Sequence, residues 1–110
     1  MVYVSITGLR LKSPRHFLRF WWHALRSMRQ ARRAPGNLMT DVRRIGNMHH
    51  TLSIWVDEAA MRRFLVRGAH LGALRAFRSI ATGRTLGFTA EAAPDWSDAH
   101  ARWSAEAKDV

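Results

Sequence analysis

Four stretches of the chain carry the alternation of apolar and polar residues that is typical of β-strands. They are Val2–Leu11, Asn37–Ile45, His49–Val56 and Arg84–Glu91. The alternation is clearest in the third stretch and weakest in the second. Only a short link that contains Gly46 and Asn47 separates the second stretch from the third. Such a link predicts a β-hairpin between them.

Two segments between these strands carry the period of a helix instead. Pro14–Arg33 follows Ser13, a suitable N-cap, and has proline at its first position. A second helix begins after Asp57, whose carboxylate suits the N-cap. Its apolar stripe shifts between Gly68 and Gly72, and we therefore expect a kink or a break there.

The order strand, helix, strand, strand, helix, strand predicts an α+β domain of ferredoxin-like type (βαββαβ) over residues 1–92. In this fold two helices cover one face of a four-stranded antiparallel sheet. We expect the more apolar face to meet the helices; it carries Val2, Val4, Ile6, Leu52, Ile54, Val56, Leu86 and Phe88. Residues 93–110 form a mildly acidic C-terminal tail, with a short helix capped by Ser97 or Asp98.

The opposite face of the predicted sheet is semi-polar. It carries Tyr3, Ser5, Thr7, Thr51, Ser53, Trp55, Thr85 and Thr89. Such a face is either exposed to solvent or forms the wall of a barrel with a second subunit. A tryptophan in the middle of a sheet favours the barrel, and so we expect a homodimer. Pairing is also a common remedy for the small core of a 110-residue chain.

The charge of the chain is large and uneven. The formal net charge is +10, and the basic residues are sixteen arginines against two lysines. Five arginines gather on one side of the first helix, opposite its apolar face, with Trp22 at their edge: Arg15, Arg19, Arg26, Arg29 and Arg33. This stripe fits an anionic surface, either nucleic acid or membrane. We favour two other interpretations: the acidic tail covers the stripe, or the stripe is simply solvated. Nucleic acid is therefore an unlikely partner.

Several classes of protein are excluded or disfavoured. The chain has no cysteine, which excludes disulfides and thiolate chemistry and fits a cytoplasmic protein. No apolar run approaches the length of about 20 residues that spans a bilayer, and we expect no signal peptide before the first strand. Phosphate loops, nucleophile elbows and zinc-protease motifs are absent as well.

The residues also carry a family resemblance. The order of elements, the strand end Leu52-Ser-Ile-Trp55, the acid-capped helix Asp57–Phe64 and Gly68-Ala69-His70 after it resemble the dimeric α+β barrel superfamily. This superfamily includes antibiotic-biosynthesis-type and heme-degrading monooxygenases. The segment Trp22–Gly36 is most similar to short proteins akin to spheroidene monooxygenase. The resemblance implies a dimeric barrel and an oxygenase-like role.

The resemblance carries over to individual residues only in part. Heme-degrading members have an asparagine on the first strand, and a tryptophan and a histidine on the second helical region. Here the first strand offers Ser5 and Thr7, while Phe64 and Leu74 stand at the other two positions. Heme degradation by that arrangement is therefore not implied. Heme bound through His70 and the absence of any cofactor both stay open.

The leading hypothesis is a pocket for a small, largely apolar ligand or a heme. We expect it to be built from Tyr3, Ser5, Asp41, Trp55, Phe64 and His70. His70 and Asp41 are the candidate catalytic groups; the other four are candidate ligand-binding residues. His49 and His50 point to opposite faces of a strand, cannot easily share a metal, and are expected at an exposed strand end. The alternatives are a non-catalytic binding or structural module, and a binder of anionic surfaces through the first helix.

Overall fold

The computed structural model describes residues 1–66 and 75–109 of the chain. Its elements follow the predicted order: β1 (Val2–Leu11), α1 (Phe17–Arg33), β2 (Asn37–Ile45), β3 (Met48–Trp55), α2 (Glu58–Leu65), β4 (Ala81–Ala90), α4 (Trp96–Glu106) and a short β5 (Lys108–Asp109). The 3-10 turn η1 (Pro14–His16) leads into α1, and residues 75–80 are also helical. The predicted kink between Gly68 and Gly72 lies outside the described residues.

The strands form one sheet in the order β2-β3-β1-β4-β5, and every neighbouring pair is antiparallel. The ferredoxin-like α+β fold is thus confirmed, with β5 as a fifth strand that the sequence pattern did not predict. The hairpin between β2 and β3 is confirmed as well, since Ile45 pairs with Met48. Its turn contains Gly46 in the left-handed region, with φ of 61°, which glycine adopts without steric cost.

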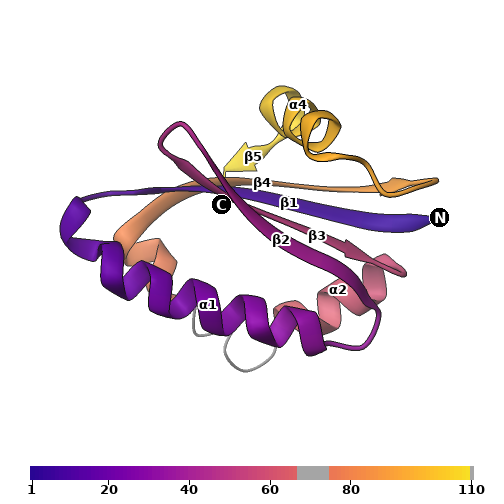
Figure 1. Cartoon of the computed structure of the whole chain (residues 1–110), viewed down its shortest axis with the longest axis horizontal. Helices are drawn as coiled ribbons and strands as arrows, with labels where there is room; N and C mark the ends of the chain where they lie inside the picture. Colours follow the sequence, from indigo (N-terminus) through magenta and orange to yellow (C-terminus); the bar gives the residue numbers. More distant parts are fainter. Residues whose placement is uncertain (67–74, 110) are drawn as a thin grey trace.

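The two faces of the sheet are covered differently. α1 and α2 lie on one side of the sheet, and α4 lies on the other (Figure 1). The prediction that α1 and α2 meet the apolar face is wrong. They cover the semi-polar face, where Trp55 packs with Ala31 of α1 and with Ala60 and Phe64 of α2. The apolar face, with Val4, Ile6 and Leu52 at its centre, packs against α4.

Chain connectivity explains this reversal better than hydrophobicity does. β1 and β2 run parallel with β3 between them, and α1 connects them. Crossovers of this kind are right-handed in nearly all proteins. The hand of the crossover therefore selects the face that the helix covers, whereas alternation only shows which residues share a face.

Helix caps explain where two helices begin. Asp57 caps α2 as predicted, because its Oδ1 accepts a hydrogen bond from the Ala60 amide at 2.8 Å. α4 begins earlier than expected: its cap is Asp95, which accepts from the amide of Asp98 at 2.8 Å, and not Ser97 or Asp98. Such a cap contributes about 1 kcal/mol.

The C-terminal tail does not lie over the arginines of α1, as one interpretation had it. α4 buries Ala99 and Trp103 against β1 and β4 instead. Three hydrogen bonds fix it there: Trp96 Nε1 donates to Asp41 (2.9 Å), Trp103 Nε1 donates to the Arg84 carbonyl (2.9 Å), and Arg84 donates to the Ala107 carbonyl (2.6 Å). Among the described residues no helix is both long and apolar enough to cross a membrane.

Candidate functional site

A cavity of about 940 Å³ lies between the semi-polar face of the sheet and the helices. The strands supply its floor, which includes Tyr3, Ser5, Thr7, Thr51, Ser53 and Thr85. The helices supply its roof, which includes Phe20, Trp21, Ala24, Met28, Met61, Phe64 and Phe77. The space is large enough for a ligand of two or three fused rings, because pockets for such ligands measure about 300–1,000 Å³.

The floor presents hydroxyl groups because of the sheet register. Ser5 pairs with Ser53, and Thr7 pairs with Thr51 and Thr85, so that these side chains share one face. Some of the hydroxyls are already occupied: Thr7 and Thr85 hydrogen-bond each other at 3.0 Å, and Ser53 accepts from Trp55 Nε1 at 2.9 Å. The hydroxyls of Tyr3 and Ser5 form no hydrogen bond within the described part of the chain. These two groups are therefore available to a ligand.

Aromatic rings close the two ends of the cavity. At one end Phe20 lies 4.9 Å from His49 and 5.2 Å from Phe77, measured between ring centroids. Trp21 meets His49 edge-on at 5.6 Å, and its buried Nε1 has no hydrogen-bond partner among the described residues. At the other end Phe64 stacks on the ring of Trp55, with centroids 5.2 Å apart. Flat aromatic ligands fit between such rings.

Glycine makes room for the tyrosine on the floor. Gly87 lies beside Tyr3, and a Cβ added at Gly87 would overlap the Tyr3 hydroxyl. Burial raises the pKa of Tyr3 above its ordinary value of 10.0; Glu58 adds to the rise and Arg62 opposes it. The Tyr3 hydroxyl therefore keeps its proton near neutral pH, where it can donate a hydrogen bond to a ligand oxygen.

The charges around the cavity favour an electron-rich ligand. Its described lining contains the cationic side chains of Lys12, Arg44 and Arg78 but only one acid, Asp109; the Arg43 guanidinium lies over Trp96 on the α4 face. Burial lowers the pKa of His49 below 6.5, and the nearby Arg44 lowers it further. His49 is therefore neutral near pH 7. A neutral imidazole can take the proton of a phenol, a role for which hydrogen-bond reach is required.

The structure brings most of the predicted pocket residues together, but not all of them. Tyr3, Ser5 and Phe64 line the cavity, and Trp55 supports Phe64 from behind. Asp41 lies on the opposite face, where it accepts the hydrogen bond of Trp96. His70 lies outside the described residues, and its place in the site stays a prediction.

Two features of this region differ from the sequence interpretation. Helices α1 and α2 of the same chain cover the semi-polar face, whereas this face was expected to form the wall of a barrel with a second subunit. His49 and His50 are not at an exposed strand end: His49 is half-buried at the cavity and His50 is buried beneath α4. An alternating strand pattern could have shown that the two histidines face different environments, but not that α4 covers one of them.

The described residues form no cluster of metal ligands. No group of three or more histidine, cysteine or acidic side chains is placed to hold a metal ion in the described segments. His49 is the described histidine whose ring lies at the cavity, where it packs against Phe20 and Trp21. The His50 ring lies on the opposite face, against Trp103 of α4.

The sheet order and the helix arrangement define a known class: the chain has the fold of the antibiotic biosynthesis monooxygenases. The crystal structure of SnoaB, a cofactor-independent oxygenase from Streptomyces nogalater, is 21% identical with a TM-score of 0.70, and the match covers 86% of this chain and 98% of SnoaB. A candidate antibiotic biosynthesis monooxygenase from Nitrosomonas europaea gives a TM-score of 0.74 at 12% identity, over 86% of this chain and 94% of that one.

A third similar structure, a candidate antibiotic biosynthesis monooxygenase from Bacteroides thetaiotaomicron, has a TM-score of 0.70 at 14% identity, over 83% of this chain and 90% of that chain. The family resemblance expected from the sequence is thus confirmed at the level of the fold. No family model matches the chain, and no curated protein matches it. Sequence identities this low show a shared fold only, and the function has to be inferred from the residues of the site.

Proposed function

We propose that the cavity binds a flat, mostly apolar molecule with oxygen substituents, and that the protein oxidises this molecule as a monooxygenase. One observation carries the proposal: free hydroxyls on the floor face a roof of aromatic and aliphatic side chains across about 940 Å³. The apolar roof favours a ring system, and the hydroxyls of Tyr3 and Ser5 suit its carbonyl or hydroxyl oxygens.

The oxidation itself rests on the fold class and on the description of SnoaB as a cofactor-independent oxygenase. A substrate that supplies its own electrons fits this kind of reaction. In the simplest case a ring methylene and one O₂ give a ring carbonyl and one H₂O. Neutral His49 is our candidate for the group that removes the first proton, and Tyr3 for the donor to the substrate oxygen.

Binding can be measured with alizarin, a three-ring quinone that carries two hydroxyl groups and absorbs visible light. Titration should shift its absorption band and quench tryptophan fluorescence. Tyr3→Phe and Ser5→Ala each remove a hydroxyl that has no partner in the described structure, and each should weaken alizarin binding about tenfold, the value of one hydrogen bond of about 1–1.5 kcal/mol. Ser104→Ala, on the exposed side of α4, is the matched control and should change nothing.

Catalysis is tested separately from binding. Anthrone, whose central methylene becomes a carbonyl in anthraquinone, is incubated with the protein under oxygen, and the disappearance of O₂ is recorded. The proposal expects uptake above the uncatalysed rate, and a loss of that excess in His49→Leu. Alizarin binding without oxygen uptake would show that the protein is a non-catalytic binding module and would refute the proposed oxygenase activity. Absence of alizarin binding would refute the proposed cavity function.

The homodimer remains a proposal as well. The cavity does not need a second subunit to form its described walls, and so dimerisation is not required for ligand binding on our account. Native mass spectrometry measures both the oligomeric state and the number of bound alizarin molecules. A dimer that holds two alizarin molecules agrees with one site per chain, whereas a dimer that holds one would place the site between subunits and contradict the cavity.

A further inference from the structure

The outer face of α1 is charged and has no counterion in the described chain. We call Arg15, Arg19, Arg26, Arg29 and Arg33 the arginine face; all five side chains are exposed. α1 contains no acidic residue. Within the described residues the single salt bridge joins Arg62 and Glu58 of α2. Because α4 packs on the far side of the sheet (Figure 1), the acidic tail does not neutralise this face.

An apolar ridge runs along the same outer face. Leu18, Trp22 and Leu25 are 81%, 55% and 49% exposed. Their spacing of four and three residues places them next to one another along the helix. Arg26 lies over the ring of Trp22, with 4.5 Å between its Cζ and the ring centroid. The outer face therefore combines exposed apolar side chains with flanking positive charge.

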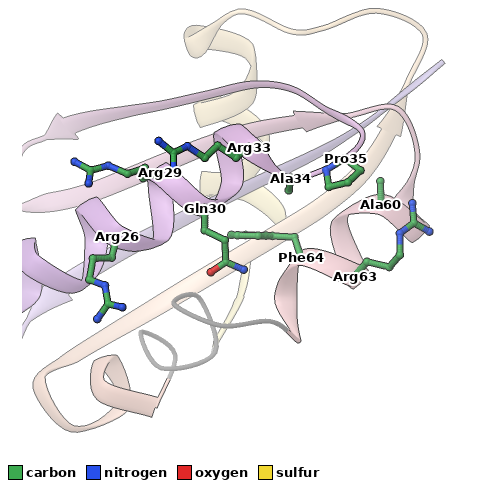
Figure 2. A pocket seen from close by; sticks show the side chains of 9 residues that line it. All are labelled: Arg26, Arg29, Gln30, Arg33, Ala34, Pro35, Ala60, Arg63 and Phe64. Carbon is green, nitrogen blue, oxygen red and sulfur yellow. The ribbon is translucent and has the colours of Figure 1, made fainter.

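A second hollow extends this surface toward α2. It has a volume of about 530 Å³ and is lined by Arg26, Arg29, Gln30, Arg33, Ala34, Pro35, Ala60, Arg63 and Phe64. Figure 2 shows the guanidinium groups spread around the hollow and pointing in different directions, not meeting at one point. A single small anion could contact only one or two of them. A surface that carries many negative charges could contact several of them at once.

We propose that the outer face of α1 docks on an anionic lipid surface, with Leu18, Trp22 and Leu25 in the interfacial layer and the arginine face on the headgroups. This arrangement is that of an interfacial amphipathic helix, which lies in the plane of the membrane. α1 has 17 residues and is about 25 Å long, enough for several headgroups. This inference concerns the outer surface and does not depend on what the cavity binds.

Other occupants explain the surface less well. A second copy of the chain, related by a two-fold axis, would set one arginine face against another, with no acid on α1 to separate them. A nucleic acid backbone would satisfy the arginines but would leave Leu18 and Leu25 without an apolar contact. A lipid surface supplies both the negative charge and the apolar layer.

The local electrostatics agree with this picture. His23 lies beside the arginine face, and its pKa is lowered below 6.5 by partial burial and by the positive charges of Arg19 and Arg26. A positive potential that acts on a neighbouring imidazole in this way also attracts anionic headgroups. The attraction weakens as salt is added, because the screening length is about 10 Å at 0.1 M ionic strength.

The test is sedimentation of the full-length protein with vesicles of phosphatidylcholine alone, and with vesicles of equal parts phosphatidylcholine and phosphatidylglycerol. The proposal expects binding to the mixed vesicles only, and weaker binding at higher salt. Each arginine near an anionic surface contributes about fivefold in affinity. Arg19→Gln, Arg26→Gln and Arg29→Gln together should therefore reduce affinity about a hundredfold. The matched control removes three exposed arginines outside α1, Arg10→Gln, Arg44→Gln and Arg102→Gln, and should retain most of the binding.

A second variant separates lipid from other polyanions at unchanged charge. Leu18→Ser with Leu25→Ser removes the aliphatic part of the ridge, and should weaken vesicle binding at least about tenfold. Three results would overturn the proposal: no binding to mixed vesicles at low salt, equal loss in the two triple arginine variants, or full binding by the leucine variant. Tight binding of a DNA duplex that needs the arginines but not the leucines would assign the surface to nucleic acid instead.

Discussion

Replacement of His50 by leucine should stabilise the protein. The His50 side chain is 1% exposed and lies beneath α4, with its ring centroid 4.6 Å from Trp103 and 5.0 Å from His100. Neither of its ring nitrogens makes a well-aligned hydrogen bond in the described structure, and the backbone of Thr7 supplies only a weak contact. A buried polar group without a partner costs about 1–3 kcal/mol. Leucine has a similar volume and no polar atom, and we expect a gain of about 1–2 kcal/mol at about pH 8.

The effect should grow in mild acid. The pKa of His50 in the folded protein lies below 6.5, first because of burial and then because His100 and His49 are positive when protonated; the backbone of Thr7 opposes the shift. Arg43 is the cross-strand neighbour of His50, and its guanidinium lies over the ring of Trp96. Above pH 6.5 the imidazole is neutral in both states. Below it the unfolded chain binds a proton that the folded chain does not bind. The free energy of unfolding therefore falls as pH drops from 6.5 toward the folded pKa, by up to about 1.4 kcal/mol per pH unit.

Urea unfolding followed by tryptophan fluorescence measures both effects. The variant should be more stable than the wild type at about pH 8, and the difference should widen by up to about 1.4 kcal/mol at about pH 5.5. His16→Leu, in η1 and away from α4, is the control for the substitution itself and should change the free energy of unfolding little at about pH 8. A His50→Leu variant that is less stable at pH 8, or a difference that stays constant with pH, would show that the histidine is satisfied in the folded protein and would refute this reasoning.

Two further substitutions test the two faces of the sheet. Gly87→Ala places a methyl group against the Tyr3 hydroxyl and should lower the free energy of unfolding by about 1–3 kcal/mol. Thermal unfolding measures this loss. The control Thr89→Ala, on the same strand, should change the stability little. Asp41→Ala removes the acceptor of Trp96 Nε1 and should destabilise α4 by about 1–2 kcal/mol. Hydrogen exchange at the amides of α4 should then be faster, and adding Trp96→Phe should cost little more. If the losses of stability from Asp41→Ala and Trp96→Phe add fully, the hydrogen bond between these two side chains contributes nothing.

The sequence predicted the elements well because local patterns determine them. Alternation located the four main strands, and the carboxylate of Asp57 marked the start of α2. The two-residue strand β5 is too short to carry any period. The start of β4 was also missed, since the strand begins at Ala81 and includes Thr82 and Gly83, whereas the predicted strand begins at Arg84. Turn residues inside a strand look like a boundary when only the sequence is read.

The site was predicted less completely because it depends on long-range geometry. Tyr3, Ser5 and Phe64 line the cavity, and alternation and periodicity place them on the face and the helix that surround it. Asp41 was assigned to the cavity, although it pairs with Leu52 and thus belongs to the α4 face. His49 was dismissed because no local signal shows that Phe20 and Trp21, on a distant helix, pack against it. The prediction assigned the helices to the wrong face of the sheet. The hand of the crossover decides which face they cover, and the period of the sequence carries no information about that hand.

The positions of the methionines allow a direct test of the central claim, that ligand binds between the semi-polar face and the helices of one chain. Met28 and Met61 line the cavity, whereas Met39 and Met48 pack on the α4 face. NMR spectra of protein labelled at the methionine methyl groups are recorded during titration with alizarin. The account predicts that the signals of Met28 and Met61 shift while those of Met39 and Met48 stay in place. Shifts confined to Met39 and Met48, or no shift at any methionine, would contradict it.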